Sequence, residues 1–301
     1  MSFRSGSVAI LGRPNAGKST VMNYIVGQKV AIVSNKPQTT RRSLLGVANR
    51  PGAQIAFYDT PGIHEPHSKL GKVMVDFAVQ TLPDADAALF VVDVSKPPTD
   101  EDKHIARLLK DFGFQRVVVV LNKMDRLRPE YVQSNYDEYE GLTKPAQMMM
   151  TSAITGENLD KVLDLLVPLL PEGPPLFDDP DFYTSQTVRD MASELIREQV
   201  LHNTREEVPH GVAVQIEGWE EPQHGNTSEI TRISALIVVE RESQKPILIG
   251  KKGQMLKKIG TAARAQIESL IGAHVFLELF VKVGEHWRDS SVRLKELGLS
   301  E

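Results

Sequence analysis

Residues 8–19 read VAILGRPNAGKS, a short apolar run followed by a glycine-rich octet that ends in Lys-Ser. The octet at 12–19 fits the pattern G-x-x-x-x-G-K-[ST], a loop that wraps the phosphates of a nucleoside triphosphate. A plausible helix follows it, so the octet lies in the strand–loop–helix context that the motif requires. Glycine at Gly12 and Gly17 lets the backbone turn tightly, so that consecutive N–H groups and the helix N-terminus point at the phosphates.

Two side chains of this phosphate loop have a predicted chemical role. Lys18 is expected to reach the β- and γ-phosphates, and the Ser19 hydroxyl to coordinate Mg²⁺. Asn15 is a candidate ligand for a monovalent cation such as K⁺, and a role in bracing the turn explains it equally well. The nucleotide contacts predicted in this segment are Gly12, Arg13, Pro14, Asn15, Ala16, Gly17, Lys18, Ser19 and Thr20.

The length of 301 residues suggests two domains, and the contents of 41% apolar and 25% charged residues are ordinary for a soluble globular chain. The absence of cysteine excludes disulfides, thiolate catalysis and cysteine-based zinc sites. The first residues lack the apolar core of a signal peptide, and the longest apolar runs are too short to cross a bilayer. These features predict a cytoplasmic protein.

The first 170 residues alternate strand-like and helix-like stretches, which predicts an α/β fold with a mostly parallel sheet and helices on both faces. Ligands of such folds bind at the carboxyl ends of the strands, where every nucleotide motif of this chain falls. The predicted strands cover residues 8–11, 44–48, 54–58, 87–92, 117–121 and 147–150, and the predicted helices cover residues 19–26, 69–81, 101–111 and 159–166.

Asn-Lys-Met-Asp at 122–125 follows one of these apolar strands and predicts guanine recognition. The Asp125 carboxylate can accept hydrogen bonds from N1–H and the exocyclic amine of guanine, whereas adenine would leave it unpaired. Sites built in this way discriminate by a factor of order 10⁴. Asn122 is expected to brace the loop and face the base, and Lys123 to lie along the ring. After a phosphate loop, this motif favours GTP over ATP.

Asp-Thr-Pro-Gly at 59–62 follows another predicted strand. Asp59 can hold Mg²⁺ through a water molecule, and the Gly62 N–H can sense a γ-phosphate. Ser152-Ala153 weakly matches the loop that touches guanine O6 through a backbone N–H. These motifs add the predicted nucleotide contacts Asp59, Thr60, Pro61, Gly62, Met124, Ser152 and Ala153.

The polar segment 37–42, Pro-Gln-Thr-Thr-Arg-Arg, has no periodicity and lies between the phosphate loop and Asp59. A threonine here could reach Mg²⁺ and the γ-phosphate, so that the segment becomes ordered only with a triphosphate, as a switch does. Thr40 is the preferred candidate and Thr39 the second. The predicted metal ligands are therefore Ser19, Thr40 and Asp59, and the predicted catalytic groups are Lys18, Thr40 and Gly62.

The residue after Gly62 is Ile63, where many GTPases carry a glutamine that orients the attacking water. Isoleucine cannot orient water by hydrogen bonding, so slow intrinsic hydrolysis is expected. Help could come from backbone groups, a monovalent cation or a partner, and no general base can be assigned from the sequence.

A Pro-rich and acidic segment at 171–181 predicts a semi-extended connection between two domains. We therefore expect a nucleotide-binding domain over residues 1–170, a linker over 171–186 and a smaller α+β domain over 187–301. In the second domain the predicted helices cover residues 187–201 and 255–270, and the predicted strands cover residues 211–219, 230–241 and 274–283.

The segment from Ser243 to Ile267 contains six Lys or Arg residues and no acid, in a chain of net charge −4. Within it, the Gly-Lys-Lys-Gly loop at 250–253 lets a backbone pass close to single-stranded RNA, with lysines against the phosphates and an apolar groove for unstacked bases. A solvated basic helix face is the alternative explanation. The predicted RNA contacts are Ile249, Gly250, Lys251, Lys252, Gly253, Lys257 and Lys258.

Taken together, these motifs resemble the Era family of bacterial GTPases, in which a P-loop domain precedes a type II KH domain. The resemblance covers nearly the whole chain, and its remaining segments are KPQTTRR at 36–42 and VVERESQKPILIGKKG at 238–253. It implies binding to the 3′ end of the small-subunit (16S) ribosomal RNA and a role in maturation of the 30S subunit. It also implies a cytoplasmic protein with some peripheral contact to the inner membrane. We expect the protein to be monomeric.

Two other functions fit parts of the sequence. A small-molecule kinase or metabolic NTPase would use the second domain to bind its substrate, which Asn-Lys-Met-Asp argues against. A GTPase could instead use the second domain to dock a protein partner.

Overall fold

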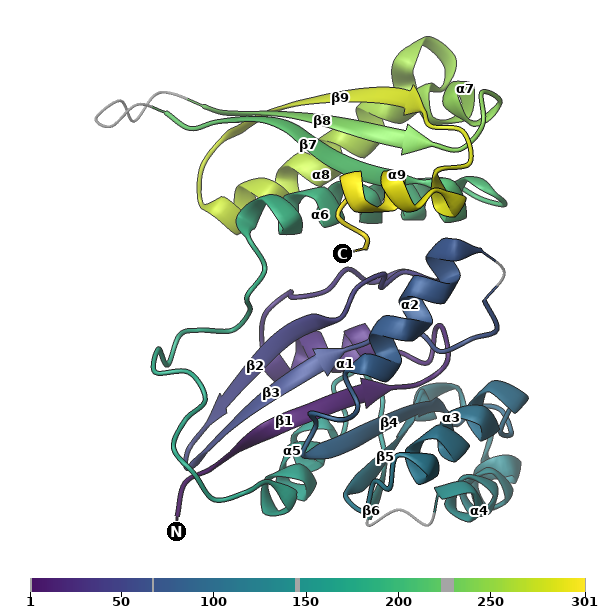
Figure 1. Cartoon of the computed structure of the whole chain (residues 1–301), viewed down its shortest axis with the longest axis vertical. Coiled ribbons are helices and arrows are strands. Elements are labelled where there is room, and N and C mark those ends of the chain that lie inside the picture. The colour runs from purple at the N-terminus through teal and green to yellow at the C-terminus, as the bar shows by residue number, and fades with distance from the viewer. Residues whose placement is uncertain (1, 67, 144–146, 223–229, 301) are drawn as a thin grey trace. The chain divides into compact units, whose positions relative to one another are not determined.

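The computed structural model describes residues 2–66, 68–143, 147–222 and 230–300. These residues form two compact units (Figure 1): the first comprises residues 2–33, 37–66 and 71–185, and the second comprises residues 186–300 together with the short segments 34–36 and 68–70.

The first unit is built on one six-stranded sheet with the strand order β2-β3-β1-β4-β5-β6. Strand β2 is antiparallel to β3, and the other neighbouring pairs are parallel. Parallel strands end at the same edge, so their carboxyl ends form the place where a ligand binds. The strands are β1 (Arg4–Leu11), β2 (Leu44–Arg50), β3 (Ala53–Asp59), β4 (Ala87–Asp93), β5 (Val117–Asn122) and β6 (Gln147–Met150).

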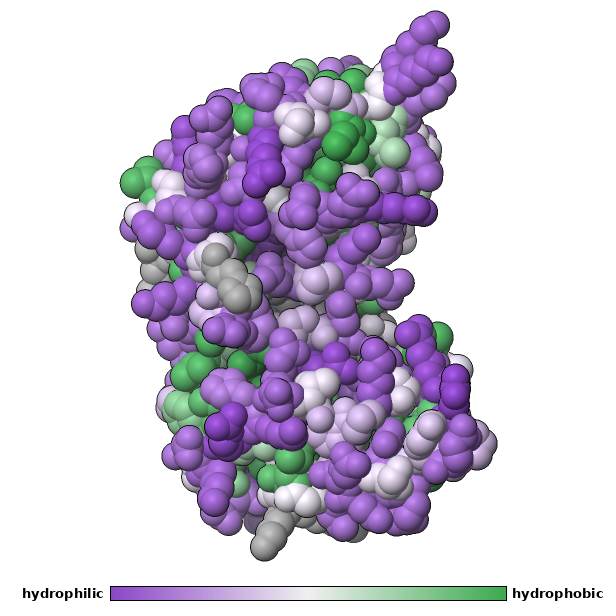
Figure 2. Space-filling view, turned by 90° about the vertical axis from the view of Figure 1, so that its right-hand side faces the viewer, coloured by the Kyte–Doolittle hydropathy of each residue, from purple (hydrophilic) through white to green (hydrophobic). Residues whose placement is uncertain are grey.

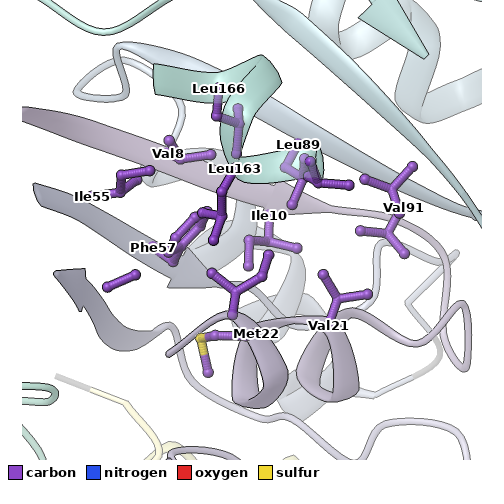
Figure 3. Close-up of a cluster of buried hydrophobic side chains, with 14 of the residues drawn as sticks. Val8, Ile10, Val21, Met22, Ile55, Phe57, Leu89, Val91, Leu163 and Leu166 are labelled. Carbon is purple, nitrogen blue, oxygen red and sulfur yellow. The ribbon is translucent and has the colours of Figure 1, made fainter. Parts of the chain in front are cut away.

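Helices cover both faces of this sheet, as predicted. Helices α1 (Lys18–Val26) and α5 (Leu159–Leu166) close one hydrophobic cluster with the sheet, drawn in Figure 3. Helices α2 (Lys69–Gln80), α3 (Asp100–Asp111) and α4 (Val132–Thr143) close the other. Strands β4 and β5 are buried at every position because each has helices above and below it.

Helix α4 was not predicted from the sequence. Only Asn135 and Tyr139 are buried in this helix, so its sequence carries little of the apolar 3.6-residue repeat that indicates a helix. The other predicted helices and strands of the unit are present, with ends that differ by a few residues.

Residues 171–185 lie against the first unit rather than extending away from it. The Gln54 side chain exchanges two hydrogen bonds with the backbone of Phe177, at 2.9 and 3.1 Å. The Val47 N–H of β2 donates to the Tyr183 carbonyl at 2.8 Å, and the Phe177 and Phe182 rings stack. This segment therefore covers the open edge of β2, which would otherwise present unpaired backbone groups. These hydrogen bonds hold the segment there, and Tyr183 packs against the hydrophobic cluster beneath α1 and α5.

The second unit packs helices on one face of a three-stranded sheet. The sheet order is β7-β8-β9, with β7 and β8 antiparallel and β8 and β9 parallel. Helices α6 and α8 contribute most of the helical core residues on that face. Its elements are α6 (Val188–Asn203), β7 (Ala213–Glu220), β8 (Thr231–Val239), α7 (Gln244–Ile249), α8 (Gln254–Ile271), β9 (Val275–Val283) and α9 (Ser291–Glu296).

Two local features show how the sequence defines this unit. Helix α6 begins after Thr187, whose hydroxyl and backbone exchange hydrogen bonds with Asp190 in a capping box. The connection from β8 to the parallel strand β9 passes through α7 and α8, because parallel neighbours need a long crossover. The basic Gly-Lys-Lys-Gly loop joins these two helices.

Among the described residues, we find no helix that is both long and apolar enough to span a membrane. Figure 2 shows one face of the protein, on which hydrophilic residues predominate and hydrophobic residues occur in small groups.

Candidate functional site

The phosphate loop follows β1, and neighbouring strands determine its shape. Gly17 has a φ of 105°, and a Cβ there would collide with the Asn122 side chain. The Asn122 amide lies so close because it donates a hydrogen bond to the Ala16 carbonyl at 2.9 Å. A Cβ at Gly12 would collide with the Val91 carbonyl. Both glycines of the motif are therefore required by close contacts as well as by backbone conformation.

Lys18 lies across its own loop. Its ammonium donates to the Gly12 and Arg13 carbonyls at 3.0 and 3.2 Å, and the side chain is buried. Burial lowers the pKa of Lys18 from 10.5 to about 8, against the opposing charge of Asp59. Backbone oxygens thus hold Lys18 at the loop, although burial disfavours its charged form.

Three oxygen-bearing side chains converge beside Lys18. The Ser19 hydroxyl lies 2.6 Å from Asp59 Oδ2 and 2.9 Å from the Thr40 hydroxyl, and Thr40 lies 3.3 Å from the same carboxylate oxygen. Asp59 Oδ1 is buried and, among the described residues, has no hydrogen-bond partner. Burial raises the pKa of Asp59, while Lys18 and the two hydroxyls oppose that shift. Such a set of hard oxygen donors fits Mg²⁺, and of the two candidate threonines it contains Thr40.

The guanine-recognition loop is fastened to the phosphate loop by buried contacts. Asn122, 1% exposed, accepts a hydrogen bond from the Ala153 N–H at 2.9 Å while its amide reaches Ala16. The Ser152 hydroxyl donates to Asp125 at 2.7 Å. These contacts leave the Asp125 side chain 28% exposed, so a carboxylate oriented by Ser152 faces a site where a guanine edge can bind.

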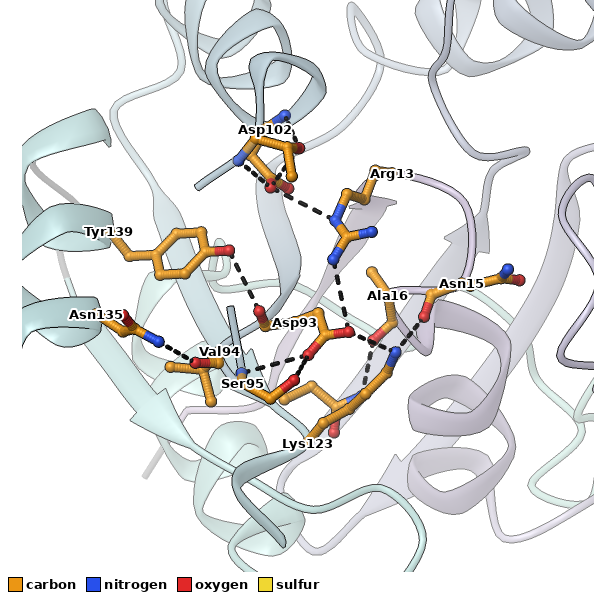
Figure 4. A network of polar contacts seen from close by, with 12 residues as sticks. Arg13, Asn15, Ala16, Asp93, Val94, Ser95, Asp102, Lys123, Asn135 and Tyr139 are labelled. Carbon is orange, nitrogen blue, oxygen red and sulfur yellow. Dashed lines mark hydrogen bonds and ion pairs between the residues drawn. The ribbon is translucent and has the colours of Figure 1, made fainter. Parts of the chain in front are cut away.

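Lys123 joins the two loops from another side. The Lys123 backbone is left-handed, with a φ of 66°. The Lys123 ammonium donates to the Asn15 carbonyl at 2.6 Å and to the Asp93 carboxylate at 2.8 Å (Figure 4). Sequence analysis did not identify Asp93, although its position at the carboxyl end of β4 is the signal that could have found it.

The Asp-Thr-Pro-Gly segment lies next to the phosphate loop. A Cβ at Gly62 would collide with the Pro14 backbone, and the Thr60 hydroxyl donates to the Ile10 carbonyl at 2.7 Å. Ile63 is 1% exposed within the core, so its side chain has no access to an attacking water. The remaining predicted nucleotide contacts, Thr20, Pro61 and Met124, lie in the same segments.

His64 was not predicted from the sequence, and it connects two loops of the site. One ring nitrogen lies 2.7 Å from the Gly62 carbonyl and the other lies 2.9 Å from the Gln38 amide nitrogen. The ring thus carries its proton on Nδ1 and accepts from Gln38. Segment 37–42, predicted as a switch, is thereby tied to the residues that follow Gly62.

The Gly-Lys-Lys-Gly loop of the second unit leaves its lysines exposed to solvent. Gly250 and Gly253 have φ values of 71° and 77°, and Lys252 also adopts a left-handed conformation, with a φ of 52°. A Cβ at Gly250 would collide with the backbone and Cβ of Met255. The turn therefore needs glycine, and it presents Lys251 and Lys252 outward at the start of α8.

A groove of about 320 Å³ begins at this loop and runs between α8 and β9. It contains the predicted contacts Gly253 and Lys257, and Arg264 adds a further cation. Phe276, 45% exposed, and Leu279 contribute apolar surface. Ile249 is half-buried beside the loop, and Lys258 is exposed on α8. Phe276 was not predicted from the sequence, because the apolar run of β9 does not show which of its residues are exposed.

Fold and site together define a P-loop GTPase joined to a KH-type domain. Models of two families match the chain, "50S ribosome-binding GTPase" over residues 7–123 and "KH domain" over residues 207–288. GTPase Era of Geotalea daltonii is 44% identical over 296 residues, which cover 98% of each chain, and GTPase Era of Heliobacterium modesticaldum is 45% identical over 299 residues, which cover 99% of this chain and 98% of the relative.

Solved structures agree with this result. A variant of Aquifex aeolicus Era bound to GDP and AlF4⁻ superposes with a TM-score of 0.93 at 41% identity, over 99% of this chain and 100% of the other. Era in complex with MgGDPNP and nucleotides 1506–1542 of 16S ribosomal RNA gives 0.94 at the same identity and coverage. The chain belongs to the Era family, and it is a GTPase with a C-terminal KH domain.

The lowered pKa of Lys18 predicts how nucleotide binding depends on pH. Below about pH 8 the lysine is charged and attracts the phosphates; above it the free protein must take up a proton on binding. We expect the affinity for GDP to be constant up to about pH 8 and then to fall by up to about tenfold per pH unit. Calorimetric titration with GDP between pH 7 and 9, in buffers of different ionisation enthalpy, measures both the affinity and the number of protons taken up on binding. A constant affinity without proton uptake up to pH 9 would contradict a lowered pKa of Lys18.

Proposed function

We propose that the protein is a GTP-driven switch that binds the 3′ region of 16S ribosomal RNA and takes part in maturation of the 30S subunit. The observation that carries this proposal is the groove beside the Gly-Lys-Lys-Gly loop, which combines cations with apolar surface on the same chain as a guanine-nucleotide site. The relative that was solved with this RNA and a GTP analogue supports it.

The groove suits single-stranded RNA for three physical reasons. Lys251 and Lys252 are exposed where the glycine turn allows a phosphate backbone to come close. Phe276 offers an exposed ring on which a base can stack. Strand β9 is the edge of its sheet, so its outer backbone groups can form hydrogen bonds with base edges.

In the nucleotide site, catalysis consists of positioning and charge stabilisation. Ser19 and Thr40 are the residues that would hold Mg²⁺, with Asp59 behind them, and the ion supplies charge neutralisation at the β- and γ-phosphates. Lys18 adds a positive charge there, and the Gly62 N–H binds the γ-phosphate. The buried Ile63 supplies no water-orienting group, so intrinsic hydrolysis is slow, which suits a protein that times an assembly step.

We propose that a monovalent cation supplies part of the charge stabilisation that GTP hydrolysis needs. Asn15 is exposed on the phosphate loop, and its side chain points away from the Lys123 contact (Figure 4). If Asn15 holds K⁺ there, GTP turnover will be faster in potassium than in sodium buffer of equal ionic strength, and an Asn15→Ala variant will lose that difference. Equal turnover of the unaltered protein in both salts would end this proposal.

We further propose that the GTPase domain covers residues 1–170, the connection 171–186 and the KH domain 187–301. We also propose that the protein is monomeric and cytoplasmic, with peripheral contact to the inner membrane. The family membership argues against a small-molecule kinase or metabolic NTPase. The basic groove argues against a second domain that only docks proteins.

RNA binding is tested by reversing the charges of the loop. A variant with Lys251→Glu and Lys252→Glu will bind an RNA of nucleotides 1506–1542 of 16S ribosomal RNA at least about tenfold more weakly, with a shallower salt dependence, because two phosphate contacts become repulsive. Phe276→Ala will weaken binding by about five- to tenfold without changing the salt dependence, because it removes a stacking surface and no charge.

A matched control carries Lys103→Glu and Lys110→Glu, which reverse two exposed lysines on α3. It has the same net charge as the loop variant and is expected to keep nearly full RNA affinity. If the loop variant bound RNA as tightly as this control does, the groove would not be the RNA site, and docking of a protein partner would become the better explanation.

A further inference from the structure

Four charged side chains form a cluster beneath the nucleotide site, which we call the Asp93 network: Arg13, Asp93, Asp102 and Lys123. Each comes from a different segment: the phosphate loop, the end of β4, the first turn of α3 and the guanine-recognition loop (Figure 4). The two positive and two negative charges balance. None of the four side chains is more than 17% exposed.

Asp93 is the centre of this network. Its Oδ2 lies 2.8 Å from the Lys123 ammonium and 3.5 Å from the Arg13 guanidinium. Its Oδ1 accepts from the Ser95 hydroxyl at 2.6 Å, which fixes the orientation of the carboxylate. The side chain is 8% exposed, so these charges interact with little screening by solvent.

The charge state of Asp93 follows from these partners. Burial alone would raise its pKa, but hydrogen bonds from Lys123 and Ser95 and the charges of Lys123 and Arg13 keep the pKa of this carboxyl below its ordinary value. Asp93 is therefore an anion throughout the range in which the protein works, and both cations depend on it.

Arg13 has a second anchor outside the nucleotide loops. Its Nε lies 3.5 Å from Asp102, which is fully buried and accepts two hydrogen bonds from Thr99 in the capping box of α3. The position of Asp102 is thus determined by the helix itself. Arg13 is held between that rigid point and Asp93.

Lys123 closes the arrangement, because it donates both to Asp93 and to the Asn15 carbonyl of the phosphate loop. One carboxylate thereby restrains both sides of the nucleotide site. We propose that Asp93 is a positioning residue that holds the phosphate loop through Arg13 and the guanine-recognition loop through Lys123, so that recognition of the base and binding of the phosphates strengthen each other.

The test uses the full-length protein with Asp93→Asn, which keeps the shape of the side chain and removes its charge. We expect the dissociation constants of GDP and of a non-hydrolysable GTP analogue to rise together, by at least about tenfold. Single-turnover hydrolysis at saturating GTP will change by less than about threefold, because Asp93 does not touch the reacting atoms.

Base selectivity distinguishes positioning from a merely structural role. Inosine diphosphate lacks the exocyclic amine that Asp125 reads, so the ratio of its dissociation constant to that of GDP reports the alignment of the guanine loop. Asp93→Asn is expected to reduce this ratio at least about threefold. A substitution that only lowers stability leaves the ratio unchanged.

Asp100→Asn is the matched control, since Asp100 is 99% exposed and pairs with Lys103 on the same helix as Asp102. It should leave both affinity and selectivity unchanged. Asp93→Asn with GDP affinity and selectivity equal to those of this control would overturn the proposal, as would weaker affinity with unchanged selectivity.

Arg13→Gln breaks one arm of the network and provides a second route if Asp93→Asn does not fold. It is expected to weaken GDP binding about tenfold and to reduce the selectivity ratio less than Asp93→Asn does, because Lys123 keeps its partner. Unchanged GDP affinity in Arg13→Gln would contradict the proposal. No RNA is present in these assays, so their failure is distinguishable from failure of the proposed RNA function.

Discussion

The buried side chain of Asn122 is the contact on which the nucleotide site depends. It joins three segments: its amide donates to the Ala16 carbonyl of the phosphate loop, and its oxygen accepts from the Ala153 N–H and from the Thr151 hydroxyl. The Asn122 side chain lies so close to the phosphate loop that residue 17 has to be glycine. A polar group buried to this degree is costly unless its hydrogen bonds are satisfied, and here they are. The sheet supplies the alignment, because β1, β5 and β6 all end at this edge.

The charged groups of the site surround the uncharged side chain of Asn122. Lys18 and Asp59 occupy the phosphate and metal side, where burial shifts both pKa values toward the neutral forms. On the other side Asp93 and its partners connect the loops through full charges. The site is thus held by short backbone contacts and by ion pairs, and the bound nucleotide adds the charges that make the burial of Lys18 favourable. In the KH domain, a single glycine turn likewise places exposed cations next to an apolar groove.

Most of this arrangement could be predicted from the sequence, because short motifs at strand ends specify both residue type and place. The phosphate loop, Asp59, Thr40 and the Asn122–Asp125 segment follow from spacing, as does the mostly parallel sheet. His64 and Phe276 belong to no such motif, and Asp93 was overlooked because it lies at a strand end without one. Asp93 and His64 act through residues distant in the sequence, and Phe276 becomes part of a groove only when β9 pairs beside β8. Helix α4 was missed because few of its residues are buried, and the contacts of segment 171–185 with β2 and β3 could not be predicted because they run through backbone groups.

Guanine nucleotide and RNA are proposed to bind to one chain and to influence each other's affinity. Ordering of the 37–42 region by the γ-phosphate is the proposed link. The most direct measurement is the dissociation constant of the 16S RNA fragment with saturating GDP and with a saturating GTP analogue, together with the affinities of both nucleotides with and without RNA. We expect tighter RNA binding with the analogue, by about five- to 150-fold, and an equal factor by which RNA favours the analogue over GDP. Equal RNA affinity in the two nucleotide states would contradict it.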